Sequence, residues 1–272
     1  MRRMDINWIS KAGWTCIATL LVTVFFTGCT GAQQQPTAEQ ETIPEVTVEQ
    51  PQEKAQPDKK DFLIAIDPGH QSWEIDMSAT EPNAPGSSVM KAKATTGTMG
   101  TFSGTYEYDL NLDISLRLRE LLKQQGFSTL LTREDNETAI SNAERATMAN
   151  DAGADILLRI HANGSENPEA SGALALVPSA ENVYVGNLSE KSTHLAQTIL
   201  QSYCDATGIE NLGVQYNDIM TGINWSAQPV VILEMGFMTN EHDDLSMAQD
   251  AFRQTMAEGI AEGVKTYFET VE

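Results

Sequence analysis

Two histidines of this sequence follow directly on apolar runs. His70 comes after "LIAIDPG", and His161 comes after "ADILLRI" within "RIHAN". If both runs are strands of a parallel sheet, the two imidazoles project at the same edge of that sheet. A single histidine at a strand end is usually a hydrogen-bonded structural residue, but two at matching ends favour a metal site, with zinc as the candidate ion. The sequence contains no H-E-x-x-H motif, so the helical zinc-protease pattern is absent.

Two glutamates are candidates to complete such a site. Glu107 lies three residues before Leu110, on the apolar face of a predicted helix. There it either interacts with the helix N-terminus or needs a compensating cation, which zinc would supply. Glu234 follows an apolar run in "PVVILEM", where it either pairs with a buried arginine or acts as a base beside a metal-bound water. Three carboxylates between the first histidine and Glu107 are alternatives to Glu107 but have no comparable place on a helix: Glu74, Asp76 and Glu81.

The alternation of apolar runs with amphipathic segments predicts the elements that position these residues. Strands are predicted at residues 62–66, 128–132, 154–160, 172–177 and 229–235, and helices at 108–126, 139–153, 189–207 and 247–271. This order predicts a single α/β domain whose mostly parallel or mixed twisted sheet has helices on both faces. The segment 72–104 fits neither period, and a connection of this length is more often functional than idle. Asp67, in the Asp-Pro-Gly break, either orients a ligand or caps the turn.

The N-terminal residues are predicted to lie outside this domain. Residues 1–29 combine a basic start, a short apolar run and small residues, as in a secretory signal, and "FTGC" resembles the lipobox of bacterial lipoproteins. The resemblance implies lipidation of Cys29 and attachment to the membrane, with an uncleaved signal anchor as the competing interpretation and a freely secreted product as the third. Residues 30–60 are rich in Gln, Glu and Pro and are predicted to form a disordered tether. The folded domain that carries the candidate site residues is then residues 61–272, facing the outside of the cytoplasmic membrane.

Composition and charge exclude some partners. The chain of 272 residues carries 17 basic and 38 acidic side chains, a net charge of −21. Nucleic acid is therefore excluded as a partner, because its phosphates would be repelled. Of the three cysteines, Cys16 and Cys29 fall in the targeting segment, which leaves Cys204 without a partner for an internal disulfide.

Five segments taken together resemble a known family. In order they are "IAIDPGHQ", "YEYDLNLDISLRLRELL", "LLTRED", "ERATMANDAGADILLRIHAN" and "PVVILEMGFMTNEHDDL", and they are similar to the signature segments of the zinc-dependent N-acetylmuramoyl-L-alanine amidases of the Amidase_3 type. The resemblance covers nearly all of residues 62–270. It implies that His70, Glu107 and His161 are zinc ligands and that Glu234 is the catalytic glutamate.

The resemblance also implies a reaction and a partner. A member of this family would cleave the amide bond between N-acetylmuramic acid and the L-alanine of the peptidoglycan stem peptide by means of Zn²⁺. The sequence departs from the usual pattern at Arg159, where a small residue or serine is usual, and at Leu212, where many members have a basic residue. No long helical insertion follows "IHAN", so an open site is expected. Two alternatives remain: a non-catalytic, membrane-tethered lipoprotein that binds peptidoglycan or activates a hydrolase, and a zinc peptidase that cuts within the stem peptide.

Overall fold

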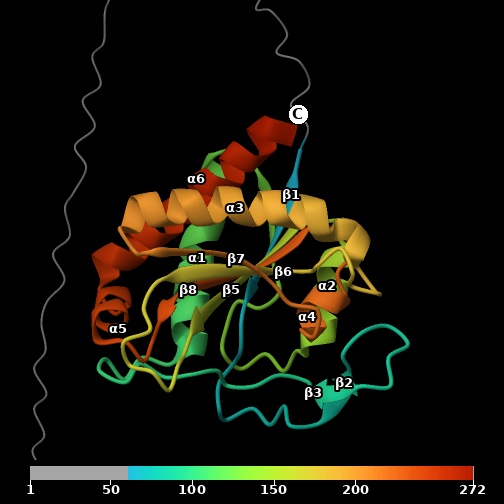
Figure 1. Cartoon of the computed structure of the whole chain (residues 1–272), viewed down its shortest axis with the longest axis horizontal. Coiled ribbons are helices and arrows are strands. Elements are labelled where there is room, and N and C mark those ends of the chain that lie inside the picture. The colour runs from blue at the N-terminus through green and yellow to red at the C-terminus, as the bar shows by residue number, and fades with distance from the viewer. Residues whose placement is uncertain (1–60, 272) are drawn as a thin grey trace, which may run out of the picture. The chain divides into compact units, whose positions relative to one another are not determined.

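The computed structural model describes residues 61–271, which form one α/β domain around a six-stranded sheet (Figure 1). The strand order is β4-β1-β5-β8-β6-β7, and only β6 and β8 pair in antiparallel fashion. The strands are β1 (Leu63–Pro68), β4 (Ser128–Leu131), β5 (Ile156–Asn163), β6 (Ala173–Val177), β7 (Asn211–Tyr216) and β8 (Val230–Phe237). The predicted fold class, a mostly parallel or mixed sheet within a single α/β domain, is therefore confirmed.

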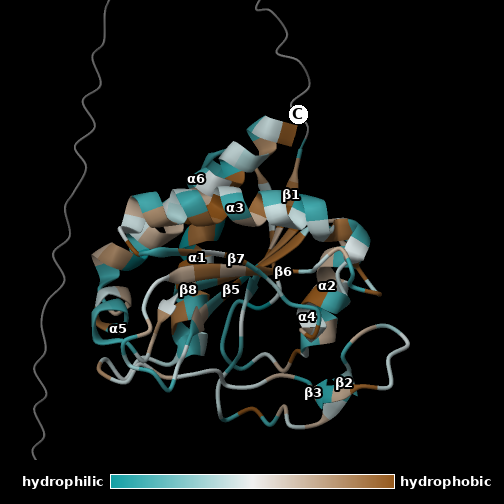
Figure 2. Ribbon diagram, viewed as in Figure 1, coloured by the Kyte–Doolittle hydropathy of each residue, from teal (hydrophilic) through white to brown (hydrophobic). Residues whose placement is uncertain are grey.

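Helices cover both faces of the sheet, as the sequence predicted. The helices are α1 (Glu107–Gln124), α2 (Asn142–Asp151), α3 (Ser189–Thr207), α4 (Thr221–Asn224), α5 (Glu241–Met247) and α6 (Asp250–Val271), with a short 3-10 turn at Gly186–Leu188. Helices α1, α3 and α6 contribute their apolar residues to the larger core cluster, whereas α2 and α4 contribute to a smaller one. In Figure 2 the strands between these layers are mostly hydrophobic, and the outer surfaces of the helices are mostly hydrophilic.

Alternating side chains of the strands separate the two core clusters. In β1, Ile64 and Ile66 lie in the larger cluster, whereas Ala65 between them lies in the smaller one. This is the two-residue period of a strand buried on both faces. Full burial of an aliphatic side chain contributes about 1.5–3 kcal/mol to the free energy of unfolding relative to exposure, so burial on both faces stabilises these central strands. By the same alternation, the face of the sheet that carries the smaller cluster also carries Asp67, Arg159 and His161. These polar side chains lie near the carboxyl ends of β1 and β5.

The structure differs from the prediction in several elements. Strand β5 continues through His161 to Asn163. The closing helix predicted at 247–271 corresponds to α6, which begins three residues later, and the short helix α5 before it was not predicted. The segment 72–104 contains a small antiparallel pair, β2 (Thr80–Pro82) and β3 (Met90–Ala92), which was not predicted. Among residues 61–271, no helix is both long enough and apolar enough to cross a membrane. The predicted signal, Cys29 and the tether lie outside the described residues.

Candidate active site

His70 follows β1 in a tight turn at the edge of the sheet. Its backbone φ of +63° lies in the left-handed region, which non-glycine residues rarely adopt. The imidazole Nδ1 lies 2.9 Å from the carbonyl oxygen of Thr95 and 3.0 Å from its Oγ1. Because a carbonyl oxygen only accepts, Nδ1 carries a proton in this arrangement, and Nε2 faces the carboxylate of Glu107. Nε2 lies 3.1 Å from Oε1 of Glu107.

Glu107 is the first residue of α1, and its carboxylate is buried, with the residue 3% exposed. Its Oε2 accepts a hydrogen bond from the backbone N–H of Thr98 at 2.8 Å, and its Oε1 accepts one from the N–H of Ala162 at 3.2 Å. Burial by itself would raise the pKa of this carboxyl group, but hydrogen bonding with the side chains of His161 and His70 outweighs it and holds the pKa well below its usual range. Glu107 is therefore ionised, and the prediction that it lies in the first helical turn is correct.

His161 lies on β5 beside both of these residues. Its Nδ1 is 3.3 Å from Oε1 of Glu107, and its ring packs edge-on against that of His70 with the centroids 4.8 Å apart. Burial lowers the pKa of His161 to about 4, so the imidazole is neutral at physiological pH. Its Nε2 is buried and has no hydrogen-bond partner within residues 61–271. A Cβ atom added at Gly69 would overlap this ring, at 2.6 Å from Nδ1, so a larger residue before His70 would displace the imidazole of His161.

These three side chains fit a divalent metal ion. One nitrogen of each histidine and one carboxylate oxygen of Glu107 lie within 4.8 Å of one another. The donor set consists of two imidazoles and one ionised carboxylate, which is the kind of set that holds catalytic zinc with a fourth position left for water or substrate. The buried Nε2 of His161, which has no hydrogen-bond partner in the described residues, also fits the role of a metal ligand.

Glu234 lies on β8 in register with His161 of β5. Neighbouring strands are about 4.8 Å apart, so the two side chains share one face at the same edge. Burial, with the charge of Glu107, raises the pKa of Glu234 to about 8, although Arg159 acts in the opposite direction. Within the described part of the chain, no ion pair to Glu234 is present, because Arg159 directs its guanidinium to Asp67 and Asn142. Glu234 is thus a buried carboxyl group with a raised pKa at the same edge of the sheet as His161.

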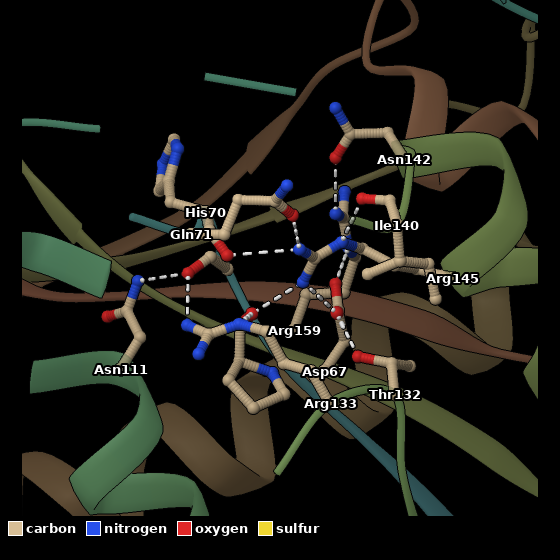
Figure 3. Close-up of polar contacts among 12 residues, drawn as sticks. Asp67, His70, Gln71, Asn111, Thr132, Arg133, Ile140, Asn142, Arg145 and Arg159 are labelled. Atoms are coloured by element: carbon tan, nitrogen blue, oxygen red, sulfur yellow. Dashed lines mark hydrogen bonds and ion pairs between the residues drawn. The ribbon is translucent and has the colours of Figure 1, made fainter. Parts of the chain in front are cut away.

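Beside His70 lies a buried polar network (Figure 3), in which two residues named in the sequence analysis, Asp67 and Arg159, bond each other, a contact that was not predicted. Asp67 is fully buried and bonds Arg145 at 2.8 Å, Arg159 at 2.6 Å and the hydroxyl of Thr132. Burial alone would raise the pKa of Asp67, but the two guanidinium groups hold it well below its usual range. Asp67 contacts neither histidine; the group that bonds the imidazole of His70 is Thr95, from the unperiodic loop.

The remaining candidates lie elsewhere. Glu74 and Asp76 are exposed, and Glu81 in β2 accepts from the backbone N–H of Ala143 at 3.1 Å. None of these carboxylates joins the cluster of His70 and His161 found in the described residues. The other side chains that the sequence singled out are also outside this cluster: His194 packs on Tyr267, His242 has an 80% exposed side chain, and Leu212 lies on the edge strand β7.

The fold and the site define a class of α/β protein in which two histidines and a glutamate meet at the carboxyl edge of the sheet, with a second glutamate in register beside them. Residues 64–266 match the family model described as Amidase_3, N-acetylmuramoyl-L-alanine amidase, and the chain belongs to this family.

Curated and solved relatives carry the same description. The amidase AmiA of Escherichia coli is 29% identical over 209 residues, which cover 64% of this chain and 72% of AmiA. The crystal structure of Ami1 from Mycobacterium smegmatis superposes with a TM-score of 0.69 at 26% identity, covering 77% of this chain and 97% of Ami1. An amidase from Clostridium difficile 630 has a TM-score of 0.63 at 26% identity and covers 79% of this chain and all of that structure (100%).

Proposed function

We propose that this chain is a zinc-dependent peptidoglycan hydrolase that cleaves the amide bond between N-acetylmuramic acid and the L-alanine of the stem peptide. The observation that carries the proposal is the meeting of His70, Glu107 and His161 beside Glu234 at one edge of the sheet. Membership of the amidase family supports the same bond as the target.

In this proposal His70, Glu107 and His161 would hold the zinc ion. The neutral imidazole of His161 and the ionised carboxylate of Glu107 are in the protonation states that a ligand needs. The carbonyl of Thr95, bonded to Nδ1 of His70, fixes the orientation of that ring. When bound, zinc would lower the pKa of a coordinated water to about 7 and polarise the carbonyl of the scissile amide.

Glu234 would move the protons of the reaction. In its ionised form, which a cation bound nearby would favour by lowering its pKa, Glu234 would accept a proton from the attacking water, whose oxygen forms a bond to the lactyl carbonyl carbon of the muramic acid. The carbon–nitrogen bond then breaks, and Glu234 gives the proton to the departing nitrogen of L-alanine. The products are a glycan strand with a free lactyl carboxylate and a stem peptide with a free amino terminus.

The proposal extends to the location of the enzyme. Residues 1–29 would act as an export signal, Cys29 would carry the lipid, and residues 30–60 would connect the membrane to the catalytic domain. The protein would then work outside the cytoplasmic membrane on the adjacent cell wall. Radiolabelled palmitate incorporation into the wild type, compared with Cys29→Ser, tests this part, and equal labelling of the two would contradict it.

Mass spectrometry of digested peptidoglycan tests the reaction itself. Full-length protein loaded with zinc should release free stem peptides, whereas Glu234→Gln should bind the wall without releasing them. Glu258→Gln is the matched control, because Glu258 is an exposed glutamate on α6 that accepts a hydrogen bond from Gln254. Stem peptides still attached to muramic acid would contradict the amidase assignment, and fragments cut within the stem would favour a zinc peptidase. Wall binding without turnover by the wild type would favour the non-catalytic lipoprotein.

A further inference from the structure

The turn that carries His70 is held by its backbone carbonyl groups. The carbonyl of Pro68 accepts from Nε of Arg133 at 2.9 Å and from Nη1 of Arg145 at 2.6 Å. The carbonyl of Gly69 accepts from Nη2 of Arg133 at 3.0 Å, and that of His70 accepts from Nη2 of Arg145 at 3.0 Å. In Figure 3 the side chains of both arginines meet this backbone, while the imidazole of His70 points away from them. Two buried guanidinium groups therefore fix three consecutive carbonyls.

These hydrogen bonds to the backbone explain how His70 keeps an unfavourable backbone conformation. A non-glycine residue with φ of +63° persists only where its surroundings determine it. Arg145 is fully buried, and it lies in the first turns of α2, whose N-terminus is closed by a capping box between Ser141 and Glu144. Helix α2 thus fixes the position of Arg145, and the hydrogen bonds of Arg145 in turn fix the backbone turn at residues 68–70.

Arg145 and Arg159 both bond the carboxylate of Asp67, but their other contacts differ. Arg145 and Arg159 bond different oxygens of this carboxylate, at 2.8 and 2.6 Å. The other contact of Arg159 is with Oδ1 of Asn142 at 2.7 Å, away from the turn. The two arginines therefore share one buried ion pair, but only Arg145 also bonds the backbone that carries His70.

We propose that Arg145, anchored by Asp67 and assisted by Arg133, is a positioning residue that holds His70 in the geometry needed for metal binding. The inference rests on the proposed role of His70 as a zinc ligand. A lysine at position 145 keeps the positive charge beside Asp67 but lacks the planar fork that spans the carbonyls of Pro68 and His70. Contacts that orient a metal ligand commonly contribute 10–100-fold to metal affinity, so a loss of about this size is expected.

The experiment compares zinc affinity in full-length wild type, Arg145→Lys and Arg159→Lys, purified in detergent and stripped of metal. Competition with a chromophoric chelator gives the dissociation constant, and melting temperatures of the metal-free proteins report stability. Both variants should melt at lower temperature, because each loses guanidinium hydrogen bonds to Asp67. Only Arg145→Lys should weaken zinc binding, by about 10–100-fold, whereas Arg159→Lys should remain within about 3-fold of wild type.

Two results would overturn the inference while leaving the proposed function intact: equal zinc affinity of wild type and Arg145→Lys, or an equal loss in both lysine variants. A wild type that binds no zinc would contradict the proposed function and the inference with it. If Arg145→Lys does not fold, Arg133→Lys takes its place, because it removes a fork from the same turn without touching Asp67. The same criteria then apply, with weakened zinc binding expected.

Discussion

Replacing Gly222 of α4 by alanine is expected to destabilise the protein through Arg159. A Cβ atom at this position would overlap Nη1 of Arg159 and lie 2.8 Å from its Nε, so one of the two groups must move. Arg159 cannot swing aside freely, because its Nε bonds Asp67 at 2.6 Å and its Nη2 bonds Asn142 at 2.7 Å. The alanine methyl group therefore competes with a buried ion pair.

The size of the effect follows from three contributions. Overpacking of a filled interior costs about 1–3 kcal/mol, and weakening the contact of Arg159 with Asp67 adds about 1–2 kcal/mol for a hydrogen bond to a charged group. The full cost of an unpaired buried charge does not arise, because Asp67 keeps its bond to Arg145. Alanine has a higher helix propensity than glycine, which stabilises the folded protein by up to about 1 kcal/mol and offsets part of this cost. We therefore expect a net loss of about 2–3 kcal/mol in the free energy of unfolding.

Urea unfolding of four proteins provides the assay: wild type, Gly222→Ala, Arg159→Ser and the double variant. With serine at 159 the space occupied by the guanidinium is vacant, so the added methyl group no longer meets an obstacle. The double variant should therefore be more stable than the sum of the single effects predicts, by at least about 1 kcal/mol. Additivity within about 0.5 kcal/mol would refute the reasoning, because it would mean that Gly222 and Arg159 do not share this space.

Three further predictions concern other parts of the domain. The pKa of Asp67 is lowered in the folded state, so its contribution to stability is present above about pH 4 and is lost as the pH falls further. Asp67→Asn should therefore reduce the slope of the unfolding free energy against pH below about pH 4, by up to about 1.4 kcal/mol per pH unit. An unchanged slope would contradict this. Burial raises the pKa of Cys204 to about 11, so its thiol should react with a disulfide reagent at pH 8 only after unfolding, and rapid labelling of native protein would be contrary evidence. Gly69→Ala should weaken zinc binding at least about 10-fold by displacing the ring of His161, which chelator competition would measure, and wild-type affinity would count against the crowding seen here.

The sequence predicts an element well where the element is long and periodic. The helix predicted at residues 189–207 coincides with α3, and the helix predicted from residue 108 differs from α1 by one residue at its start. Strand β7 was missed, because it lies at the edge of the sheet with largely exposed side chains and so has no apolar pattern. The antiparallel direction of β6 was also not specified, because direction depends on the path of the connecting segments and not on the apolar period.

The same contrast applies to the site. His70 and His161 were recognisable because both follow apolar strands, and Glu107 because of its phase on a helix. Arg145 carried no comparable signal, since its partner Asp67 is 78 residues away in the chain. Thr95, in the loop that bonds His70, lies in a segment without periodicity. Residues that act through contacts distant in sequence become visible only when the fold brings them together.

The glycines around the site show why its rigidity cannot be read from the chemically active residues alone. Gly69 lies against the ring of His161, and a Cβ atom on Gly97 would come within 2.9 Å of the carboxyl carbon of Glu107 and 2.8 Å of His70. Gly97 also has φ of +77°, which a larger residue would rarely adopt. Backbone therefore fills the space into which these side chains would otherwise rotate. In the proposed zinc site, these side chains would therefore lose little conformational freedom on binding the ion, and the two glycines would contribute to affinity without contacting it.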